Sequence, residues 1–424
     1  MEQRITILLG AGSMIDFTSI STKTLTEKII NNCKKYKIND SNDTSLVDAI
    51  CNAFLKIYHK EGLSSSKKFT KMDIITNIIS FEDIYHVLEL LPNYLNTCGY
   101  KSNESAFQIF SKLNQEFESL KLQNIYSAAH EIIKTINDEI YAYDSQYTDR
   151  GKKFAEFFRD IEKTTNLKFD IFNLNYDTWV EQTLCDYNDG FVEIPNYENK
   201  MKRFDITEYL KSNDKHTISH LHGQICFEYP EFSSQDINTY VFQESHNTLY
   251  KYVDFSTAKS YRERSIRSSD HTQSGENLFR TNIVTGLMKT DKLLWNPLII
   301  YHNKLVNSLL TNQRLILIGY GFSDLYINNS LLQYNAMHFN ERKIIMIDYI
   351  SDEDWQPQIE HPFSPSAKAV FTNLMFKDDF WCCRHPFAPK EPMYYSKDKM
   401  ACIFKNGFND VINNHLADVI KFIS

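Results

Sequence analysis

The chain has 424 residues, of which 42% are hydrophobic and 14% aromatic. Disordered chains lack this apolar content, so we expect a packed protein. The length exceeds that of one ordinary compact core and predicts a large α/β domain with a substantial insertion or second domain. A net charge of −8 does not favour the phosphate backbone of nucleic acids, so we expect no direct sequence-specific nucleic-acid binding.

No targeting or membrane-spanning segment is recognisable in the sequence. The first residues, MEQRITILLGAGS, hold an apolar run too short for a secretory signal, and no other run reaches the ~18 residues that span a membrane. The 8 cysteines are scattered, without the dense spacing of a disulfide scaffold. We therefore expect a cytoplasmic protein that does not contact a membrane.

The chain is expected to begin with a strand, a glycine turn and a helix. Residues 4–9 (RITILL) are apolar and largely β-branched and stop at Gly10, and residues 25–30 continue in a helical pattern. From about residue 40 to residue 165, apolar side chains recur three and four positions apart, as in SAFQIFSKLNQEF. This stretch predicts a large helical insertion.

Four further strands are expected after the insertion. Apolar runs occur at residues 169–173, 216–221, 314–318 and 343–347, and the stretches between them are long enough for helices. Short apolar strands that alternate with helices predict a doubly wound parallel sheet covered by helices on both faces. We therefore expect one α/β domain over residues 1–350.

Two segments fall outside this pattern. Residues 256–282 are polar and nearly free of aliphatic side chains, which predicts a mobile loop or a lid that becomes ordered on binding. Residues 351–424 carry aromatic and proline residues and finish in an amphipathic helix. They predict a C-terminal extension that packs on the domain or mediates oligomerisation.

The first motif is GAGS, formed by Gly10, Ala11, Gly12 and Ser13. Glycines between a strand and a helix let backbone amides approach a diphosphate, whose charge the helix N-terminus also favours. The dehydrogenase fingerprint has a third glycine at the position that Ile15 occupies here. On GAGS alone, a purely structural glycine turn remains an alternative.

The second motif is NLNYDTW, in which Asn175 and Asp177 follow a strand. Ligands of open α/β sheets collect at such strand ends. An asparagine offers both a donor and an acceptor and an aspartate offers an acceptor, which suits ribose hydroxyls and a carboxamide. The alternative is that these polar residues only shape a loop.

The third motif is SHLHG, which contains His220 and His222. A histidine can take up a proton near neutral pH, as a general base must. The two side chains point in opposite directions if the segment is extended, so we expect His222 to be functional and His220 to be structural. Taken singly, either residue would more often be an ordinary packed or surface histidine.

The fourth motif is IGYGFSD, in which Gly319, Gly321 and Ser323 follow a strand. Glycines at this position again permit a ligand to approach the backbone closely. The fifth is IIMIDY, a strand that ends in Asp348, whose carboxylate can accept hydrogen bonds from a nucleotide. For Asp348 a structural role is the stronger alternative.

In their order along the chain, these five motifs resemble the sirtuin family, specifically its prokaryotic NAD-hydrolysing branch. The resemblance implies a Rossmann-like domain that binds NAD as a substrate. It also implies that Asn175 and Asp177 hold the nicotinamide riboside and that His222 is the catalytic histidine. The segments SFEDI (80–84) and TGLMK (285–289) also resemble recurrent pieces of this branch, with no chemical role assigned to them.

The sequence departs from the deacylases of this family in two places. The deacylases carry a zinc ribbon built from two Cys-x-x-Cys pairs, and no such pair occurs here, so we expect no zinc and no other metal. The deacylase loop that follows the first motif is here MIDFTSISTKTLT, in which Asp16 is retained as a cofactor-binding candidate but the arginine is missing. The acyl-lysine tunnel is therefore not expected.

The resemblance predicts an NAD glycohydrolase that releases nicotinamide and ADP-ribose and depletes NAD during antiviral defence in prokaryotes. It also implies control by a homo-oligomer or by a separately encoded hexameric ATPase of the HerA type. One alternative is an NAD-dependent protein deacylase or ADP-ribosyltransferase. Another is a noncatalytic sensor of NAD or of ADP-ribose derivatives, because a fold alone does not prove turnover.

Overall fold

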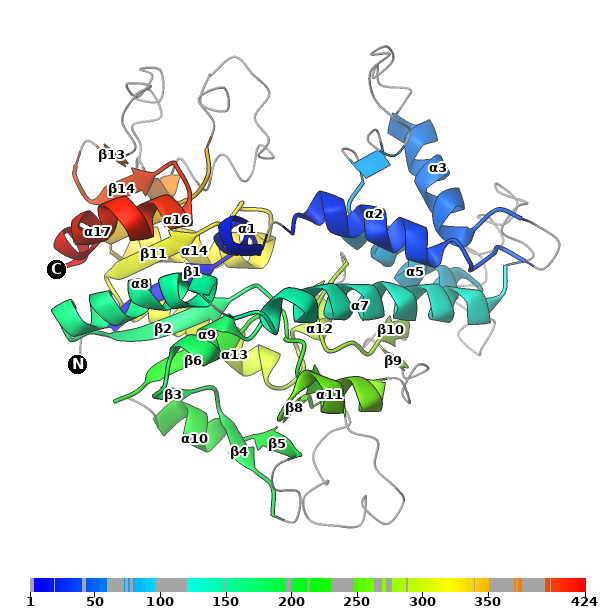
Figure 1. Cartoon of the computed structure of the whole chain (residues 1–424), viewed down its shortest axis with the longest axis horizontal. Helices are drawn as coiled ribbons and strands as arrows, with labels where there is room; N and C mark the ends of the chain where they lie inside the picture. The colour runs from blue at the N-terminus through cyan, green and yellow to red at the C-terminus, as the bar shows by residue number, and fades with distance from the viewer. Residues whose placement is uncertain are drawn as a thin grey trace.

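The computed structural model of the chain describes five main ranges, apart from short gaps inside them and a few residues between them. These ranges are residues 4–58, 79–95, 120–229, 248–350 and 393–424. Figure 1 shows a central sheet between helices, with several insertion helices extending beyond one end of it. Within the described part of the chain, no helix is both long and apolar enough to cross a membrane.

The five strands that the sequence predicts are confirmed and lie side by side in one sheet. They are β1 (Arg4–Leu9), β2 (Lys168–Asn173), β6 (His216–His220), β11 (Arg314–Ile318) and β12 (Lys343–Ile347). The complete sheet has eight strands in the order β13-β14-β12-β11-β1-β2-β6-β3, and seven of them run parallel. The protein is therefore a mixed α/β protein built on a parallel sheet.

Strand β1 is the point at which the chain changes direction across the sheet. From β1 the chain builds outward through β2 to β6, then returns to the other side of β1 and builds outward through β11, β12 and β14. The connections that leave β1 and its neighbour β11 therefore diverge. Such a divergence opens a crevice at the carboxyl ends of the strands, where α/β proteins bind ligands.

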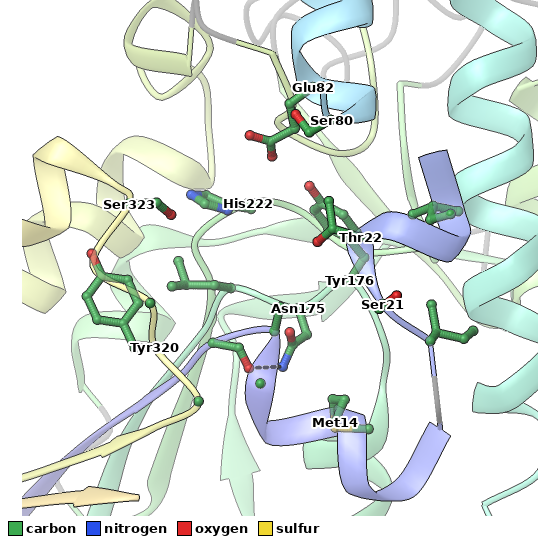
Figure 2. Close-up of a pocket in the computed structure, with 18 of the residues that line it drawn as sticks. Met14, Ser21, Thr22, Ser80, Glu82, Asn175, Tyr176, His222, Tyr320 and Ser323 are labelled. Atoms are coloured by element: carbon green, nitrogen blue, oxygen red, sulfur yellow. Dashed lines mark hydrogen bonds between the residues drawn. The ribbon is translucent and has the colours of Figure 1, made fainter. Parts of the chain in front are cut away.

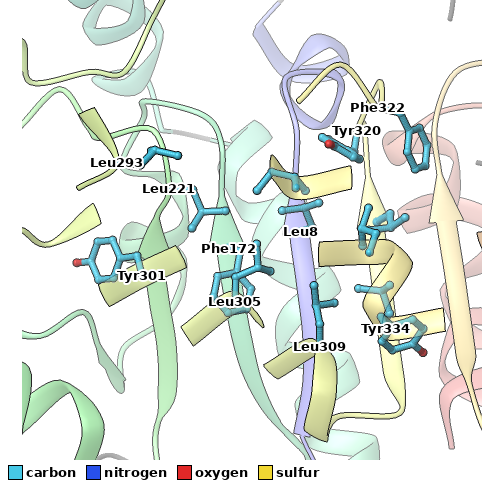
Figure 3. Close-up of a cluster of buried hydrophobic side chains, with 14 of the residues drawn as sticks. Leu8, Phe172, Leu221, Leu293, Tyr301, Leu305, Leu309, Tyr320, Phe322 and Tyr334 are labelled. Atoms are coloured by element: carbon cyan, nitrogen blue, oxygen red, sulfur yellow. The ribbon is translucent and has the colours of Figure 1, made fainter. Parts of the chain in front are cut away.

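Both faces of the sheet are covered, because successive side chains of β1 point to opposite faces. Ile5, Ile7 and Leu9 belong to a buried cluster with the phenylalanines of α8 (Asp149–Thr165). Leu8 belongs to a second cluster with α13 (Leu298–Thr311) and α14 (Leu325–Met337), part of which Figure 3 shows. The doubly covered sheet explains why its strands consist almost entirely of aliphatic residues.

A helical insertion separates β1 from β2, as expected. Its described helices are α1 (Gly12–Thr18), α2 (Thr22–Cys33), α3 (Leu46–Tyr58), α5 (Phe81–Leu95), α7 (Leu122–Asp144) and α8. Side chains of α2, α3, α5 and α7 form a hydrophobic cluster of their own, centred on residues such as Ile29, Ile84 and Ile132. The segment SAFQIFSKLNQEF, also expected to be helical, lies outside the described residues.

The polar segment over residues 256–282, for which a mobile loop or a lid is expected, includes regular elements among its described residues. It contains most of α11 (Phe255–Arg262) and a hairpin of β9 (Ser269–His271) and β10 (Asn277–Phe279). Helices and hairpins satisfy their hydrogen bonds through the backbone, so polar side chains do not prevent them from forming. Residues 263–268 and 272–276 lie outside the described residues.

Additional short elements flank β6 and precede α13. They are β3 (Tyr187–Asn188) at the edge of the main sheet, α9 (Trp179–Thr183), α10 (Ile206–Lys211), α12 (Lys289–Lys292), and a small antiparallel sheet of β4 (Phe191–Glu193), β5 (Met201–Phe204), β8 (Tyr250–Tyr252) and β7 (Phe227–Glu228).

The core of the sheet continues past residue 350. Strand β14 (Ala401–Phe404) is fully buried and pairs in parallel with β12, and β13 (Met393–Tyr395) pairs antiparallel with β14. After β14 come the short helix α16 (Phe408–Asp410), a π-helical turn at Val411–His415, and α17 (Leu416–Ile423), whose buried residues contact the same cluster as α8. The C-terminal region therefore completes the sheet.

Candidate functional site

A cavity of about 500 Å³ lies at the carboxyl ends of the central strands. This volume is within the range of small-molecule sites in proteins. Its floor is formed by the segments that follow β1, β2 and β11, one side by the first residues of α2, and its roof by the first residues of α5 together with Lys289 of α12. The polar and glycine residues that line it are Gly10, Gly12, Thr18, Ser21, Thr22, Ser80, Glu82, Tyr143, Asn175, Tyr176, His222, Lys289, Gly319, Tyr320, Gly321, Ser323, Asp324 and Asp348.

The floor is made by two glycine turns that pack backbone against backbone. The amide of Gly12 donates to the carbonyl of Gly319 at 3.0 Å. A Cβ atom on Gly10 would lie 2.3 Å from the Gly319 oxygen, and one on Gly319, whose φ is +60°, would lie 2.0 Å from the Ser13 nitrogen. These three glycines are required by the fold itself.

Gly321 differs from the other glycines of the floor. No atom lies within 4 Å of the position that its Cβ would occupy, and the residue lines the cavity. The interpretation that a glycine lets a ligand approach the backbone therefore applies best to Gly321. Ala11 also lines the cavity, whereas Ser13 is buried beneath it.

Asn175 is held rigidly on the floor. Its Nδ2 donates to the carbonyl of Gly10 at 3.2 Å and to Oγ of Ser13 at 3.0 Å, and its own amide donates to Oδ1 of Asn173 at 2.9 Å. None of the described residues donates a hydrogen bond to Oδ1 of Asn175. This side chain therefore presents an oriented acceptor to whatever occupies the cavity (Figure 2).

His222 pairs with Asp324, the last residue of the motif IGYGFSD, which was not among the predicted site residues. Nε2 of His222 lies 3.1 Å from Oδ2 of Asp324, and both side chains are largely buried. The other carboxylate oxygen accepts from the amides of Tyr326 and Ile327, which caps α14. Asp324 thus links the start of this helix to the histidine.

The electrostatics of this pair select one form of the His222 ring. Burial alone would raise the pKa of Asp324, but its hydrogen bond to His222 and the charge of His222 outweigh burial and hold the pKa well below its usual range. Because an ionised carboxylate can only accept, the proton of a neutral ring sits on Nε2. Nδ1 is then the acceptor, as a general base requires.

Asp177, which the resemblance implies to be a ribose-binding residue, does not line the cavity. Its Oδ1 accepts from the amide of Trp179 at 3.1 Å, and its Oδ2 accepts from the hydroxyl of Tyr143 at 3.2 Å. Burial raises the pKa of Asp177 to about 6. Tyr143 lines the cavity, so Asp177 reaches the site only through this hydroxyl.

The remaining predicted residues divide between the cavity and the surface beside it. Ser323 and Asp348 line the cavity, and the pKa of Asp348 is raised to about 6 by burial and further by the charge of Asp16. Asp16 is exposed and outside the lining, where its carboxylate accepts from the amide of Asn409 at 3.0 Å. It supports the C-terminal region instead of the cavity.

Three helices of at least twelve residues begin at the cavity: α2 at Thr22, α5 at Phe81 and α14 at Leu325. The N-terminus of a helix carries partial positive charge, so these helices together favour an anionic ligand. The Ser21 cap of α2 and the Ser80–Asp83 pair at α5 mark these starts in the sequence. Their convergence on one cavity has no sequence signal.

The described residues contain no cluster of three or more His, Cys, Asp or Glu side chains that could hold a metal ion. Compared with models of protein families, the chain matches none, and no curated protein sequence matches it. The resemblance to sirtuin-like proteins therefore rests on the motif residues alone.

Proposed function

We propose that this chain binds NAD in the cavity and hydrolyses its nicotinamide–ribose bond. The observation that carries the proposal is the His222–Asp324 pair, which lines the same cavity as the oriented carboxamide of Asn175. A base with a fixed ring form beside an oriented acceptor suits the activation and positioning of water.

The sheet supports the binding part of the proposal. Numbered along the chain, the strands β1, β2, β6, β11, β12 and β14 stand in the spatial order 3-2-1-4-5-6, which is that of Rossmann-like dinucleotide-binding domains. In this family of folds the diphosphate lies at a glycine turn and a helix N-terminus. The open side of Gly321 and the helix starts at the cavity supply such features.

The proposed reaction balances without a metal or a redox partner. The bond between C1′ of the ribose and the pyridinium nitrogen breaks, and its electron pair neutralises the ring as nicotinamide leaves. The sugar becomes an oxocarbenium-like cation, to which water adds on C1′. Nδ1 of His222 accepts the proton that this water loses, while Oδ1 of Asn175 holds the water or a ribose hydroxyl in place.

From the resemblance stated above we further propose a role in antiviral NAD depletion in prokaryotes, in the cytoplasm. Control by a homo-oligomer or by a HerA-type ATPase belongs to the same proposal. A protein deacylase or ADP-ribosyltransferase and a noncatalytic sensor remain the competing functions. All three functions share the cavity, and they differ in the product that is formed.

The test is to incubate the purified chain with NAD and to separate the products by chromatography. We expect nicotinamide and ADP-ribose, and we expect His222→Ala to lower kcat by about 10³-fold because the general base is lost. His415→Ala, which changes a histidine near the C-terminus, is the matched control. NAD binding without any product would replace hydrolysis by sensing, and a product that forms only with an acylated peptide would favour the deacylase.

A further inference from the structure

The segments SFEDI and TGLMK, which are about two hundred residues apart in sequence, meet at the roof of the cavity. Nζ of Lys289 donates to Oε1 of Glu82 at 3.1 Å. A second pair, between Lys292 and Glu89, is almost completely buried. The two glutamates are two helical turns apart on α5, so both pairs fasten α12 to the same helix face.

The pairs Glu82–Lys289 and Glu89–Lys292, here called the clamp, hold α12 against α5. The clamp also requires Gly286. This glycine has a φ of +82°, and a Cβ on it would lie 3.0 Å from Oε2 of Glu89 and 3.2 Å from the ring of Tyr85. The close contact between the TGLMK segment and α5 therefore depends on the missing side chain. The clamp therefore holds the side chain of Glu82 in position.

Glu82 points into the cavity from above. Figure 2 shows its carboxylate on the side of the cavity opposite Asn175, with His222 between these two levels. The side chain of Glu82 is 31% exposed and that of Lys289 is 22% exposed, so both are accessible to a ligand. Glu82 also lies in the first turn of α5, where a helix stabilises a negative charge.

Glu82 and Lys289 line the same cavity as Asn175 and His222, and their charges act on neighbours of those two residues. Burial raises the pKa of Tyr176, and the charge of Glu82 raises it further. Burial raises the pKa of Asp324, but the larger effect of His222 lowers it below its usual value, and the charge of Lys289 lowers it further. The charge of Glu82 therefore acts next to Asn175, and the charge of Lys289 acts on the partner of His222.

The other carboxylates of the lining are less suited to stabilise positive charge on a ligand. Asp324 is committed to His222 and to the cap of α14. Asp348 follows β12, whereas His222 and Asn175 follow β6 and β2 on the other side of β1. Glu82 has one oxygen on Lys289, and none of the described residues donates a hydrogen bond to its second oxygen.

We propose that Glu82 faces the positively charged nicotinamide riboside of the bound dinucleotide and stabilises the cationic sugar while nicotinamide leaves, with Lys289 as its positioning residue. This inference rests on the proposed function. Glu82 forms no covalent bond: the electron pair still leaves with nicotinamide, and the proton of the attacking water still goes to His222. The carboxylate acts by charge alone, and it acts most strongly when the sugar is most positive.

The first experiment compares the turnover of NAD by the wild-type chain, Glu82→Gln and Lys289→Met. Glu82→Gln keeps the shape and removes the charge, so we expect kcat to fall by about 100-fold with KM little changed. Lys289→Met is expected to have a smaller effect that Lys289→Arg rescues. Glu208→Gln, which changes an exposed glutamate paired with Lys211 on α10, is the matched control.

The second experiment measures binding without turnover. In a His222→Ala background, the dissociation constants of NAD⁺ and of NADH are compared by calorimetry, because NADH lacks the pyridinium charge. Glu82→Gln is expected to reduce the preference for NAD⁺ by about threefold or more. An unchanged preference together with full turnover by Glu82→Gln would overturn the inference and leave the proposed function standing. An inactive wild type whose preference still depends on Glu82 would overturn the hydrolase and leave the assignment of Glu82.

Discussion

The floor and the roof of the cavity are held together by different forces. On the floor, the turns at Gly10 and Gly319 contact each other through backbone atoms, with no room for a Cβ. On the roof, α5 and α12 are joined by the side-chain pairs Glu82–Lys289 and Glu89–Lys292. The comparison indicates that Gly10 and Gly319 on the floor tolerate no added atom, whereas the outer pair of the roof can change its charge without a change of shape.

The largest effect is expected on the floor. Gly319→Ala places a methyl group on Ser13 and Gly12 at a positive φ, so we expect it to lower the free energy of unfolding by about 3 kcal/mol. Gly321→Ala, two residues later in the same turn, meets open space and is expected to keep wild-type stability while weakening dinucleotide binding. Denaturant unfolding of the two variants checks this, and equal stability would mean that the floor is less crowded than described.

A somewhat smaller effect is expected at Asp324, which has two roles: it caps α14 and it pairs with His222. Asp324→Asn retains a side chain that caps α14 well but removes the charge that orients His222. We expect kcat to fall by about 100-fold with a nearly unchanged melting temperature. Asp324→Ala is expected to lose the same activity and also about 1 kcal/mol of stability. If both variants melted alike, the cap would not depend on this carboxylate.

The smallest effect is expected at Asp177, which is hydrogen-bonded to the cavity residue Tyr143, and it is an effect of pH on stability. Burial raises the pKa of Asp177 from 3.8 to about 6, so the folded state holds this proton more tightly than the unfolded state does. The resulting stability is complete below about pH 4 and is lost as the pH rises through about 6. Asp144 next to it, raised to about pKa 7 by burial and by the charge of Asp177, adds to the same loss.

Asp177→Asn removes this ionisation, keeps an acceptor for the amide of Trp179, and places an NH2 group that can donate to the hydroxyl of Tyr143. Between pH 5 and pH 8 we expect the variant to lose about 1.4 kcal/mol less stability than the wild type, because about one pH unit of this window lies below the raised pKa of Asp177. Unfolding free energies at several pH values measure the difference. Asp160→Asn, on the exposed side of α8, is the control, and parallel pH profiles for wild type and Asp177→Asn would contradict the prediction.

The framework of the fold follows from local patterns in the sequence. The strands at residues 4–9, 314–318 and 343–347 are short aliphatic runs between helical stretches, and such runs identify buried parallel strands. Strand β14 was missed because ACIF is only four residues long and follows an irregular aromatic region. The hairpin of β9 and β10 was missed because its residues are polar.

The candidate site could be predicted only where a residue follows its strand directly. Asn175, His222 and Asp348 reach the cavity because the carboxyl ends of parallel strands meet at one edge of the sheet. Asp177 does not line the cavity, because its carboxylate accepts from the amide of Trp179 and from the hydroxyl of Tyr143. Glu82 and Lys289 come from helices whose approach depends on tertiary packing, which no local pattern encodes.

The contact between Gly10 and Gly319 also has a consequence for the order of folding. Strands β1 and β11 are neighbours in the sheet but lie roughly three hundred residues apart in the chain, so their pairing closes a very long loop and contributes a high contact order. The insertion helices have a hydrophobic cluster of their own and can associate earlier, through contacts that are closer in sequence. We therefore expect the cavity to form at a late kinetic step, because a nascent chain that has not yet reached Arg314 carries the roof helices without the β11 segment of the floor.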